Sequence, residues 1–525
     1  MYLEKIKITN FRCFDSAGIE ACFNKGVNSV IGENNAGKSA LIDALRIAFS
    51  AVPYQRDIYF KKSDFHVDLS GVQAREAQFD LYFAEVPMEL IEIWTPESDN
   101  HGEFHIRFYL TKTAAGDEKV KFAAWGGSFE GNTLSSDLFD AIDISYLGAL
   151  RDAEEGLRPS RNSRLAALLG TVADSPEKRQ ELINVLNNAN QQLMEKEQIR
   201  KVKDIINSNL GGIEQEVLSQ RIDIGFTEPR FEAIASTIRS WVGMKWVRIS
   251  KTDVPAEQLV GLSAKPGYKQ VHNDHLLVNI PVLLQTAHLQ GEDIADVEAA
   301  LQRYQQCFEL QQNGLGYNNL IYMATILGDM SVAKEGIYQR LLLVEEPEAH
   351  LHPQLQELIY DYFQKQQEGR DIQIVFTSHS PTLTSKIELD QINLLYEQDH
   401  AIRCMPMAQC KAAANPTDKA HLKKYLDVTK SQMFFAKGLI FVEGISEALL
   451  LPDIADALKR PLDKYAVEVI NVDSLAFKPF AHLLYRDDRM PSFCKAAIIT
   501  DDDRCLEKND QYISADIDYD DDIAG

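Results

Sequence analysis

Runs of apolar residues divide the chain into predicted strands and helices. The stretch GVNSVIGENNAGKSALIDALRIAF carries a short apolar strand through a glycine-bounded loop into a helix. Between about 75 and 145, alternating apolar and polar positions in Phe104–Leu110 and Val120–Trp125 predict antiparallel strands. We expect residues 1–154 to form an N-terminal lobe from these elements.

From about 155 to 240 the pattern becomes polar and heptad-like, with Pro176 near the start of a helix. This pattern predicts an inserted helical arm. An ordinary amphipathic bundle would give the same pattern.

In the second half of the chain, apolar strands are followed directly by polar residues that can take part in chemistry. Two such strands, in Leu341–Pro353 and Asp371–Pro381, predict a second α/β lobe over residues 241–395. We interpret residues 396–430 as a linker and residues 431–525 as a third α/β region. The pattern therefore predicts an α/β protein of several domains.

Length, composition and charge argue against several classes of protein. At 525 residues with 45% hydrophobic content, the chain can bury more than one core. It has no apolar run long enough to span a membrane and no signal-peptide pattern, so we expect no membrane association and a cytoplasmic location. Its seven cysteines form no CxxC pair, which argues against a zinc site or a disulfide framework. The net charge of −24 argues against a broadly basic DNA-binding surface, although local fields can oppose the net sign.

The segment Gly32–Ser39 fits the phosphate-binding pattern G-x-x-x-x-G-K-[ST] between a strand and a helix. Backbone N–H groups of the loop and the positive end of the helix dipole can hold phosphate oxygens. Lys38 would place a charge on the β- and γ-phosphates, and the Ser39 hydroxyl suits Mg²⁺. We therefore predict ATP and Mg²⁺ as cofactors, with a glycine-rich turn of no function as the alternative. The predicted nucleotide-binding residues of the loop are Gly32, Asn34, Asn35, Ala36, Gly37, Lys38 and Ser39.

A phosphate loop also needs an acidic strand end, and Leu341–Glu346 supplies one. Glu345 stands where aspartate is usual and is the predicted Mg²⁺ contact, while Glu346 is the better candidate for the general base. The two glutamates could instead be a solvated strand end, but the proline that follows argues for a fixed turn. His379 follows another apolar strand, a position from which its imidazole can contact the γ-phosphate. Alone it would more often be a structural histidine; beside the other two motifs it is a predicted sensor.

Together these motifs resemble the ABC-type ATPase head of the SMC, Rad50 and RecF group. Ile8–Arg12 resembles the opening strand of that group, whose basic residue, here Arg12, lies near the nucleotide. Asn313 and Gly314, before a predicted helix, occupy the place of the signature loop but depart from its usual Ser-Gly-Gly pattern. The resemblance implies a head split by an insertion, and a homodimer in which the signature loop of one subunit closes on ATP held by another. It also implies that the helical arm at 155–240 serves dimerisation.

A second group of acidic residues lies near the C-terminal end. Glu443 ends an apolar strand, Glu447 follows in a predicted helix, and Asp501 and Asp503 end another strand. Parallel strands can gather such carboxylates in one crevice. Hard oxygen ligands select Mg²⁺ or Mn²⁺, and two such ions can assist phosphodiester cleavage. Surface carboxylates that cap strands and a helix are the alternative.

This arrangement resembles the Toprim domain. The resemblance implies Glu443, Asp501 and Asp503 as metal ligands, with Glu447 as a ligand or an acid/base, whereas Asp502 points away. It also implies a later lysine near the scissile phosphate. Only Lys508 follows the Asp-x-Asp motif here, so we expect the given chain to be incomplete.

An SMC-like ATPase joined to a Toprim domain resembles the OLD family of nucleases, to which the ATPase subunit of the Gabija phage-defence system is related. The resemblance implies nucleotide-regulated, metal-dependent nicking or cleavage of DNA in bacterial defence, with room for a second defence-system protein as partner. Arg158, Arg161 and Arg164 are candidate DNA phosphate contacts, or simply solvated surface.

The main alternative function is an ATP-gated DNA-binding or scaffold ATPase whose Toprim-like module is inactive and acts through a partner. A transporter ATPase is disfavoured because the chain lacks a transporter-type signature. A primase or topoisomerase is disfavoured because no zinc site or strand-passage module precedes the Toprim-like region.

Overall fold

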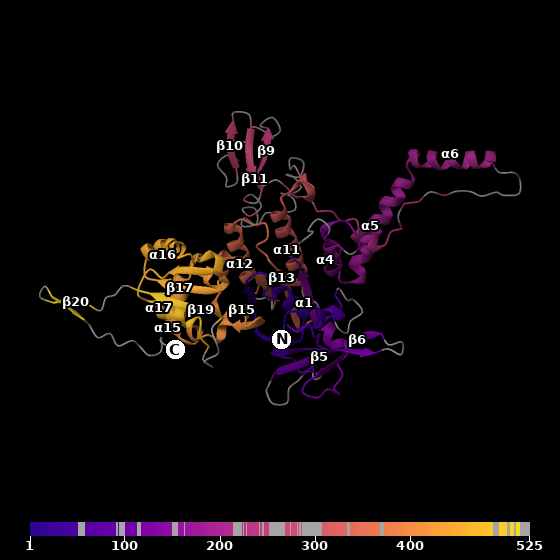
Figure 1. The fold of residues 1–525 in the computed structure, drawn as a ribbon. Coiled ribbons are helices and arrows are strands. Elements are labelled where there is room, and N and C mark those ends of the chain that lie inside the picture. Colours follow the sequence, from indigo (N-terminus) through magenta and orange to yellow (C-terminus); the bar gives the residue numbers. More distant parts are fainter. Residues whose placement is uncertain are drawn as a thin grey trace. The chain divides into compact units, whose positions relative to one another are not determined.

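The chain forms two compact units in a computed structural model (Figure 1). The first unit comprises residues 1–150 and 333–525, and the second comprises residues 151–332. The structure describes the chain apart from residues 51–57, 91–92, 94–99, 113–116, 150–155, 162, 214–222, 224, 227, 241, 244–245, 251–267, 273–274, 281, 283–284, 286–306, 333–335, 368–371, 487–492, 501–504, 509–510 and 515–525.

An antiparallel sheet of five strands, in the order β2-β1-β4-β5-β6, forms one layer of the first unit. The alternation predicted from the sequence is present, because Phe104, Ile106 and Phe108 of the fourth strand in this order are all buried. The prediction of antiparallel strands between 75 and 145 is thus confirmed. The strands are β1 (Tyr2–Thr9), β2 (Ile19–Cys22), β4 (Glu76–Ala84), β5 (His101–Lys112) and β6 (Glu118–Gly126).

The second layer is a six-stranded sheet in the order β16-β15-β3-β14-β13-β7, parallel except for the β15–β16 pair. Every residue of its strands β3 and β14 is buried, as expected where both faces of a parallel sheet are covered. The strands are β3 (Val27–Gly32), β7 (Ile142–Leu147), β13 (Gln339–Glu345), β14 (Ile372–Ser378), β15 (Ile392–Gln398) and β16 (Ala401–Pro406).

Helix α1 (Lys38–Phe49) follows β3 and shares one hydrophobic core with both sheets. Its last residue, Phe49, packs edge-on against Phe83 and Phe104 of the antiparallel sheet, with ring centroids 6.3 and 6.0 Å away. Leu341 of β13 belongs to the same core. The strand ends that carry the predicted chemistry therefore meet at one edge of the parallel sheet, beside the start of α1.

Residues 396–430, which we expected to be a linker, are part of the folded first unit. They contain β16 and the helices α14 (Lys411–Ala414) and α15 (Pro416–Tyr425). Strands β15 and β16 form a tight hairpin, because Asp399 and His400 both have positive φ, 50° and 62°. Such a turn usually carries Asn-Gly or Asp-Gly. Because this turn has neither pair, nothing in the sequence indicated the hairpin.

The C-terminal region is a separate parallel sheet in the order β18-β17-β19. Val442, at the end of the middle strand, pairs with Asn471 and Ile499, so all three strands end together. The elements are β17 (Gly438–Val442), α16 (Ile445–Ala457), β18 (Val467–Asn471), α17 (Phe477–His482) and β19 (Lys495–Ile499), followed by a β20–β21 hairpin (Cys505–Lys508 and Gln511–Ser514).

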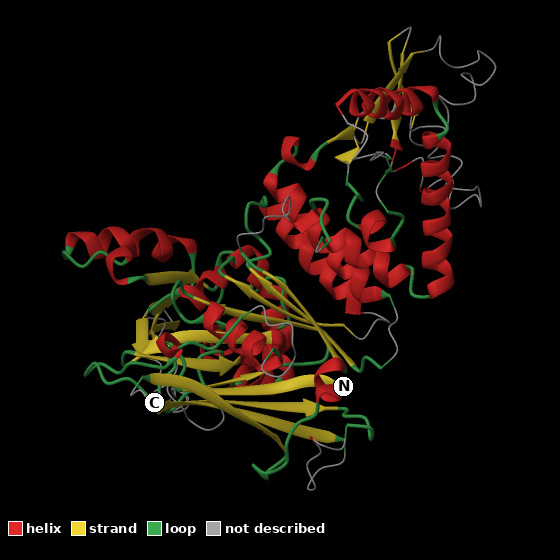
Figure 2. Cartoon of the chain, turned by 90° about the vertical axis from the view of Figure 1, so that its right-hand side faces the viewer, coloured by secondary structure: helices red, strands yellow, loops and turns green. Residues whose placement is uncertain are grey.

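The second unit is mostly helical, with a small group of strands (Figure 2). The predicted helix start is confirmed, because Ser175 caps α5 by accepting a hydrogen bond from the Lys178 amide, and Pro176 is its first residue. Residues 241–332, which we expected in the second ATPase lobe, fall in this unit. Its elements are α4 (Arg164–Val172), α5 (Pro176–Met194), α6 (Glu197–Ile213), α7 (Phe231–Ala235), β8 (Val242–Gly243), β9 (Trp246–Ser250), β10 (Tyr268–His272), β11 (His275–Asn279), β12 (Cys307–Phe308), the 3₁₀ turn η4 (Leu310–Gln312) and α11 (Leu315–Ser331).

Among the described residues, no helix is both long enough and apolar enough to cross a lipid bilayer.

Candidate functional site

The glycine-rich loop between β3 and α1 requires glycine at both ends. Gly32 has φ 152°, and a Cβ there would lie 2.2 Å from the Leu395 carbonyl oxygen. Gly37 has φ 87°, and a Cβ there would lie 2.8 Å from Cys13 Sγ. The loop is therefore a close-packed cradle that ends on the first turn of α1, where backbone N–H groups lack helical partners.

Two asparagines of this loop, Asn34 and Asn35, are exposed, and Asn35 also has positive φ, 67°. Ala36 is buried, and its amide donates to the Glu33 carbonyl oxygen at 3.2 Å. The predicted loop residues are thus brought together in one tight turn.

Lys38 is buried at the start of α1 and folds back over the loop. Its Nζ donates to the carbonyl oxygens of Gly32 and Glu33, both at 2.8 Å. Burial lowers the pKa of Lys38, and the nearby carboxylates of Glu346, Glu348 and Glu33 oppose this shift. A phosphate placed on the cradle would meet an ammonium group held by the loop itself.

Ser39 and Glu345 lie side by side, as the predicted Mg²⁺ contacts must. The Ser39 hydroxyl donates to Glu345 Oε2 at 2.8 Å. A hydroxyl beside a carboxylate is an oxygen donor set that fits Mg²⁺, with phosphate oxygens and water as the remaining ligands. The two residues are 306 positions apart in the chain, and they meet because β13 ends beside the first turn of α1.

Tyr146, at the end of β7, is a site residue that the sequence analysis missed. Its hydroxyl donates to Glu345 Oε1 at 2.9 Å. Burial and the Glu345 carboxylate raise the pKa of Tyr146. The Arg46 guanidinium lies 3.5 Å from the centre of the tyrosine ring. Both oxygens of Glu345 are therefore fixed by hydroxyl donors.

Glu346 turns away from the strand with φ 45°, a left-handed conformation that is rare for residues other than glycine. Its amide is held by Thr377 on β14, at 3.1 Å from the carbonyl oxygen and 3.2 Å from the hydroxyl. Glu346 Oε1 lies 3.5 Å from Nδ1 of His379. The predicted base and the predicted sensor thus face each other at the same sheet edge.

Glu348 is a second residue that the sequence analysis missed. Its side chain is buried, and Oε1 accepts from the Ser378 hydroxyl at 2.7 Å and from the His379 amide at 3.1 Å. Oε2 is buried without a hydrogen-bond partner among the described residues. Burial raises the pKa of Glu348. This carboxyl group fixes the backbone that carries the His379 imidazole.

Arg12 forms ion pairs with two acidic residues, of which one, Asp43, belongs to α1. Its guanidinium donates to Asp43 of α1 at 2.6 Å and to Asp64 at 2.9 Å. Asp43 also accepts from Arg46 at 2.9 Å. The structure thus ties Arg12 to the helix that follows the phosphate loop, and its contact with nucleotide stays a prediction.

Asn313 and Gly314 lie in the second unit, at the start of α11. Gly314 is the N-cap of that helix, and Asn313 Nδ2 donates to Asn318 Oδ1 at 3.0 Å. Their predicted contact with ATP held by another subunit stays a prediction.

The C-terminal acidic residues lie where the strands β17 and β19 end. The Thr500 hydroxyl, directly after β19, donates to the Glu443 carboxylate. Glu447 follows in the first turn of α16, and its carboxylate lies over Gly444, 3.1 Å from where a Cβ would stand. Asp501 and Asp503 lie outside the described residues. In the part of the chain that the structure describes, no three His, Cys, Asp or Glu side chains are grouped to hold a metal ion.

Comparisons with known proteins match two domain families to this chain. The profile of the AAA ATPase domain matches residues 1–227 and 174–384. The TOPRIM domain of overcoming lysogenization defect protein-like proteins matches residues 434–503.

Two curated nucleases are similar over most of the chain. The endonuclease GajA of Bacillus cereus is 24% identical over 561 residues, which cover 97% of this chain and 77% of GajA. The OLD nuclease of Thermus scotoductus is 19% identical over 483 residues, which cover 89% of this chain and 76% of that nuclease. Among solved structures, the SMC head bound to the C-winged helix domain of ScpA has a TM-score of 0.41 at 13% identity, covering 77% of this chain and 98% of that one.

Proposed function

This chain belongs to the AAA ATPase domain family and carries an OLD-like TOPRIM domain, and we propose that it is an ATP-hydrolysing, metal-dependent DNA endonuclease of bacterial anti-phage defence. Similarity to the two nucleases over most of their length supports the DNA-cleaving part of the proposal. Similarity to GajA supports the defence role.

The observation that carries the ATPase proposal is that the strands β3, β7, β13 and β14 all end around the phosphate loop. Lys38 and Ser39 would hold ATP and Mg²⁺ together with Glu345, whose carboxylate already contacts the Ser39 hydroxyl. When bound, ATP supplies the phosphoanhydride bond to be hydrolysed, and Mg²⁺ neutralises its phosphate charge. Glu345 is kept in place for this contact by Tyr146.

Glu346 is the proposed general base. Thr377 holds its amide, so the carboxylate position is set by the neighbouring strand and not by a flexible loop. His379, 3.5 Å away, would keep the carboxylate oriented and contact the γ-phosphate. Glu348 acts on this pair through the His379 amide and is a positioning residue.

The proposed cleavage site lies at the end of the β17 strand. Glu443, Asp501 and Asp503 would hold Mg²⁺ or Mn²⁺, with Glu447 as a further ligand or an acid/base. The contact between Thr500 and Glu443 supports this assignment, because Asp501 follows Thr500 directly in the chain.

A homodimer is the proposed working form. Asn313 and Gly314 of one subunit would close on ATP held by the other, and the helical insertion would contribute to the contact. This assembly would make hydrolysis depend on protein concentration.

Plasmid nicking tests the nuclease proposal. The intact protein, with supercoiled plasmid and Mg²⁺ or Mn²⁺, is expected to accumulate nicked DNA with a rate that ATP changes. Asp501→Ala and Glu443→Gln should abolish nicking, and Asp502→Ala, the matched control, should retain it. ATP turnover with no nicking under any metal would instead favour an ATP-gated DNA-binding or scaffold ATPase acting through a partner. Nicking that is unchanged in Asp501→Ala would remove the site assignment.

A further inference from the structure

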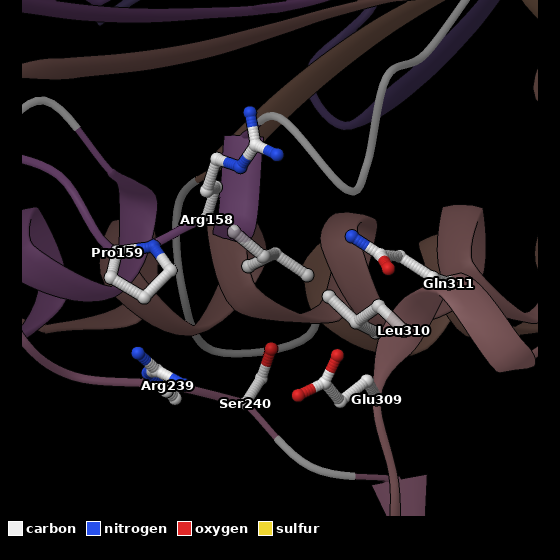
Figure 3. Close-up of a pocket in the computed structure, with 8 residues that line it drawn as sticks. Arg158, Pro159, Arg239, Ser240, Glu309, Leu310 and Gln311 are labelled. Atoms are coloured by element: carbon white, nitrogen blue, oxygen red, sulfur yellow. The ribbon is translucent and has the colours of Figure 1, made fainter.

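The second unit contains a cavity of about 360 Å³ that the proposed function does not use. Its walls come from three segments, residues 157–159, 239–240 and 309–311. Cavities that bind small molecules span roughly 300–1,000 Å³, so this one suits a ligand of modest size. All residues of its lining are described, and Figure 3 shows how they lie.

The lining carries more positive than negative charge. Arg158 and Arg239 both line the cavity, and neither forms an ion pair with a carboxylate among the described residues. Glu309 stands on the side opposite Arg239 (Figure 3), and its carboxylate already caps the η4 turn through the Gln312 amide. The two guanidinium groups are therefore the groups available to an anion.

A buried hydroxyl adds a second, independent feature. Ser240 Oγ is buried, and it has no hydrogen-bond partner among the described residues. Figure 3 shows it between Arg239 and Glu309, pointing toward the middle of the group. A buried hydroxyl without a partner is costly, and a ligand oxygen in the cavity would remove that cost.

The remaining walls are apolar. Leu157 and Leu310 are 1% and 6% exposed, and Pro159 lines the cavity beside Arg158. Guanidinium groups recognise phosphate through paired hydrogen bonds, and the apolar wall suits a flat or aliphatic body. Glu309 and Gln311 would then face polar hydroxyl or amino groups of the same ligand. This set of groups fits a phosphorylated molecule of nucleotide size.

The cavity wall is connected to the signature-loop residues by hydrogen bonds. The Leu310 carbonyl oxygen accepts from Asn318 Nδ2 at 2.8 Å, and Asn318 Oδ1 accepts from Asn313 Nδ2 at 3.0 Å. Asn318 is buried, so one fixed amide side chain holds both the wall and the loop. A shift of the wall would have to move Asn313 or break one of these bonds.

We propose that this cavity binds a phosphorylated small molecule through Arg158 and Arg239, and that its occupancy sets the position of Asn313. The binding half stands independently of the proposed function. The effect on hydrolysis rests on the proposed function, because it requires Asn313 to act on ATP.

A direct binding experiment, with adenosine monophosphate as the probe, tests whether the cavity binds a phosphorylated small molecule. Equilibrium dialysis uses the full chain with Lys38→Ala, which weakens binding at the phosphate loop. Adding Arg158→Ala and Arg239→Ala should weaken binding at least tenfold. Arg200→Ala and Arg230→Ala, also exposed arginines of this unit but outside the cavity lining, should leave it unchanged. Circular dichroism confirms that each variant is folded. Unchanged affinity in the double arginine variant would overturn the proposal.

A titration with a DNA duplex tests whether the cavity binds the phosphates of a DNA backbone and not those of a small molecule. The same variants are titrated with a short duplex in the absence of nucleotide. If the two arginine changes weaken duplex binding but leave adenosine monophosphate binding intact, the cavity belongs to a DNA backbone path and the proposal fails.

Measurements of ATP turnover test whether occupancy of the cavity affects hydrolysis through Asn313. Adenosine monophosphate is expected to change the turnover of the otherwise unaltered chain by at least threefold, and the change should disappear in the Arg158→Ala, Arg239→Ala variant. A change that persists in that variant would indicate competition at the phosphate loop and would overturn the coupling. Because the dialysis measures no turnover, its failure is distinguishable from a failure of the proposed ATPase or nuclease function.

Discussion

Tyr146 and Glu345 are joined by a hydrogen bond of 2.9 Å, although they are 199 residues apart in the chain. The other oxygen of the same carboxylate accepts from Ser39. The predicted Mg²⁺ contact is thus held from two sides, by the phosphate-loop helix and by the neighbouring strand β7.

Tyr146→Phe should raise the Mg²⁺ concentration needed for half-maximal ATP turnover by about tenfold, the lower end of what loss of a hydrogen bond to a metal ligand costs. The physical reason is that Glu345 loses one of its two fixed donors. Tyr360→Phe is the matched control, because it removes a tyrosine hydroxyl that bonds to Gln391 elsewhere in the unit. An unchanged Mg²⁺ dependence in Tyr146→Phe would contradict the assignment.

Glu346→Gln should lower ATP turnover by a factor on the order of 10²–10⁴ while ATP binding is retained, because the amide cannot accept the proton of water. Lys38→Ala should instead weaken binding itself. Nucleotide binding by fluorescence titration and turnover by phosphate release separate the two effects. Normal turnover in Glu346→Gln would show that another group acts as base.

Gly37→Ala should abolish ATP binding, because its Cβ would meet Cys13 Sγ at 2.8 Å in a backbone with φ 87°. Gly71→Ala is the matched control. Gly71 has a similar φ of 81°, but a Cβ there would meet nothing within 4 Å. The control should lose about 1–2 kcal/mol of stability from backbone strain alone and keep ATP binding. Denaturation and binding measured on both variants would test this; equal binding by the two would contradict the close-packed cradle.

The pH dependence of stability should report the buried Glu348 carboxyl. Its pKa is raised in the folded chain by burial, so the folded state holds this proton more tightly than the unfolded state. Stability from this group is then present below the ordinary glutamate pKa, about 4.3, and is lost as pH rises through the higher folded value. In Glu348→Gln, the free energy of unfolding should therefore fall less as the pH rises.

Urea denaturation from acid to neutral pH measures the effect of Glu348→Gln. Glu357→Gln, at a half-buried glutamate of the same region, serves as the control and should keep the wild-type slope. Parallel pH profiles for wild type and Glu348→Gln would show that this carboxyl does not contribute.

The sequence predicted the parts of the ATP site that follow buried strands. Glu345 and His379 follow apolar strands, and Lys38 and Ser39 follow the glycine-bounded loop after a third one. Parallel strands bring such ends together. Tyr146 and Glu348 were missed for physical reasons. Tyrosine at a strand end gives no chemical signal until the neighbouring strand is known, and Glu348 acts only through burial against Ser378.

The least predictable part of the fold was the region after the ATPase strands. The Asp399–His400 turn lacks glycine, so the β15–β16 hairpin gave no signal and was taken for a linker. In the C-terminal sheet, the position of Glu443 at a strand end was predicted, and its contact with Thr500 agrees with that prediction. The positions of Asp501 and Asp503 stay predictions.

The packing of α1 limits how the first unit can respond to nucleotide. Its apolar side chains are part of one core with both sheets, and protein interiors are too dense to deform locally. A displacement imposed on its first turn must therefore carry the antiparallel sheet along with the parallel one. Nucleotide-driven motion in this unit should thus be a rotation of the whole ATPase body, visible as domain reorientation in scattering or crosslinking and not as a local loop change.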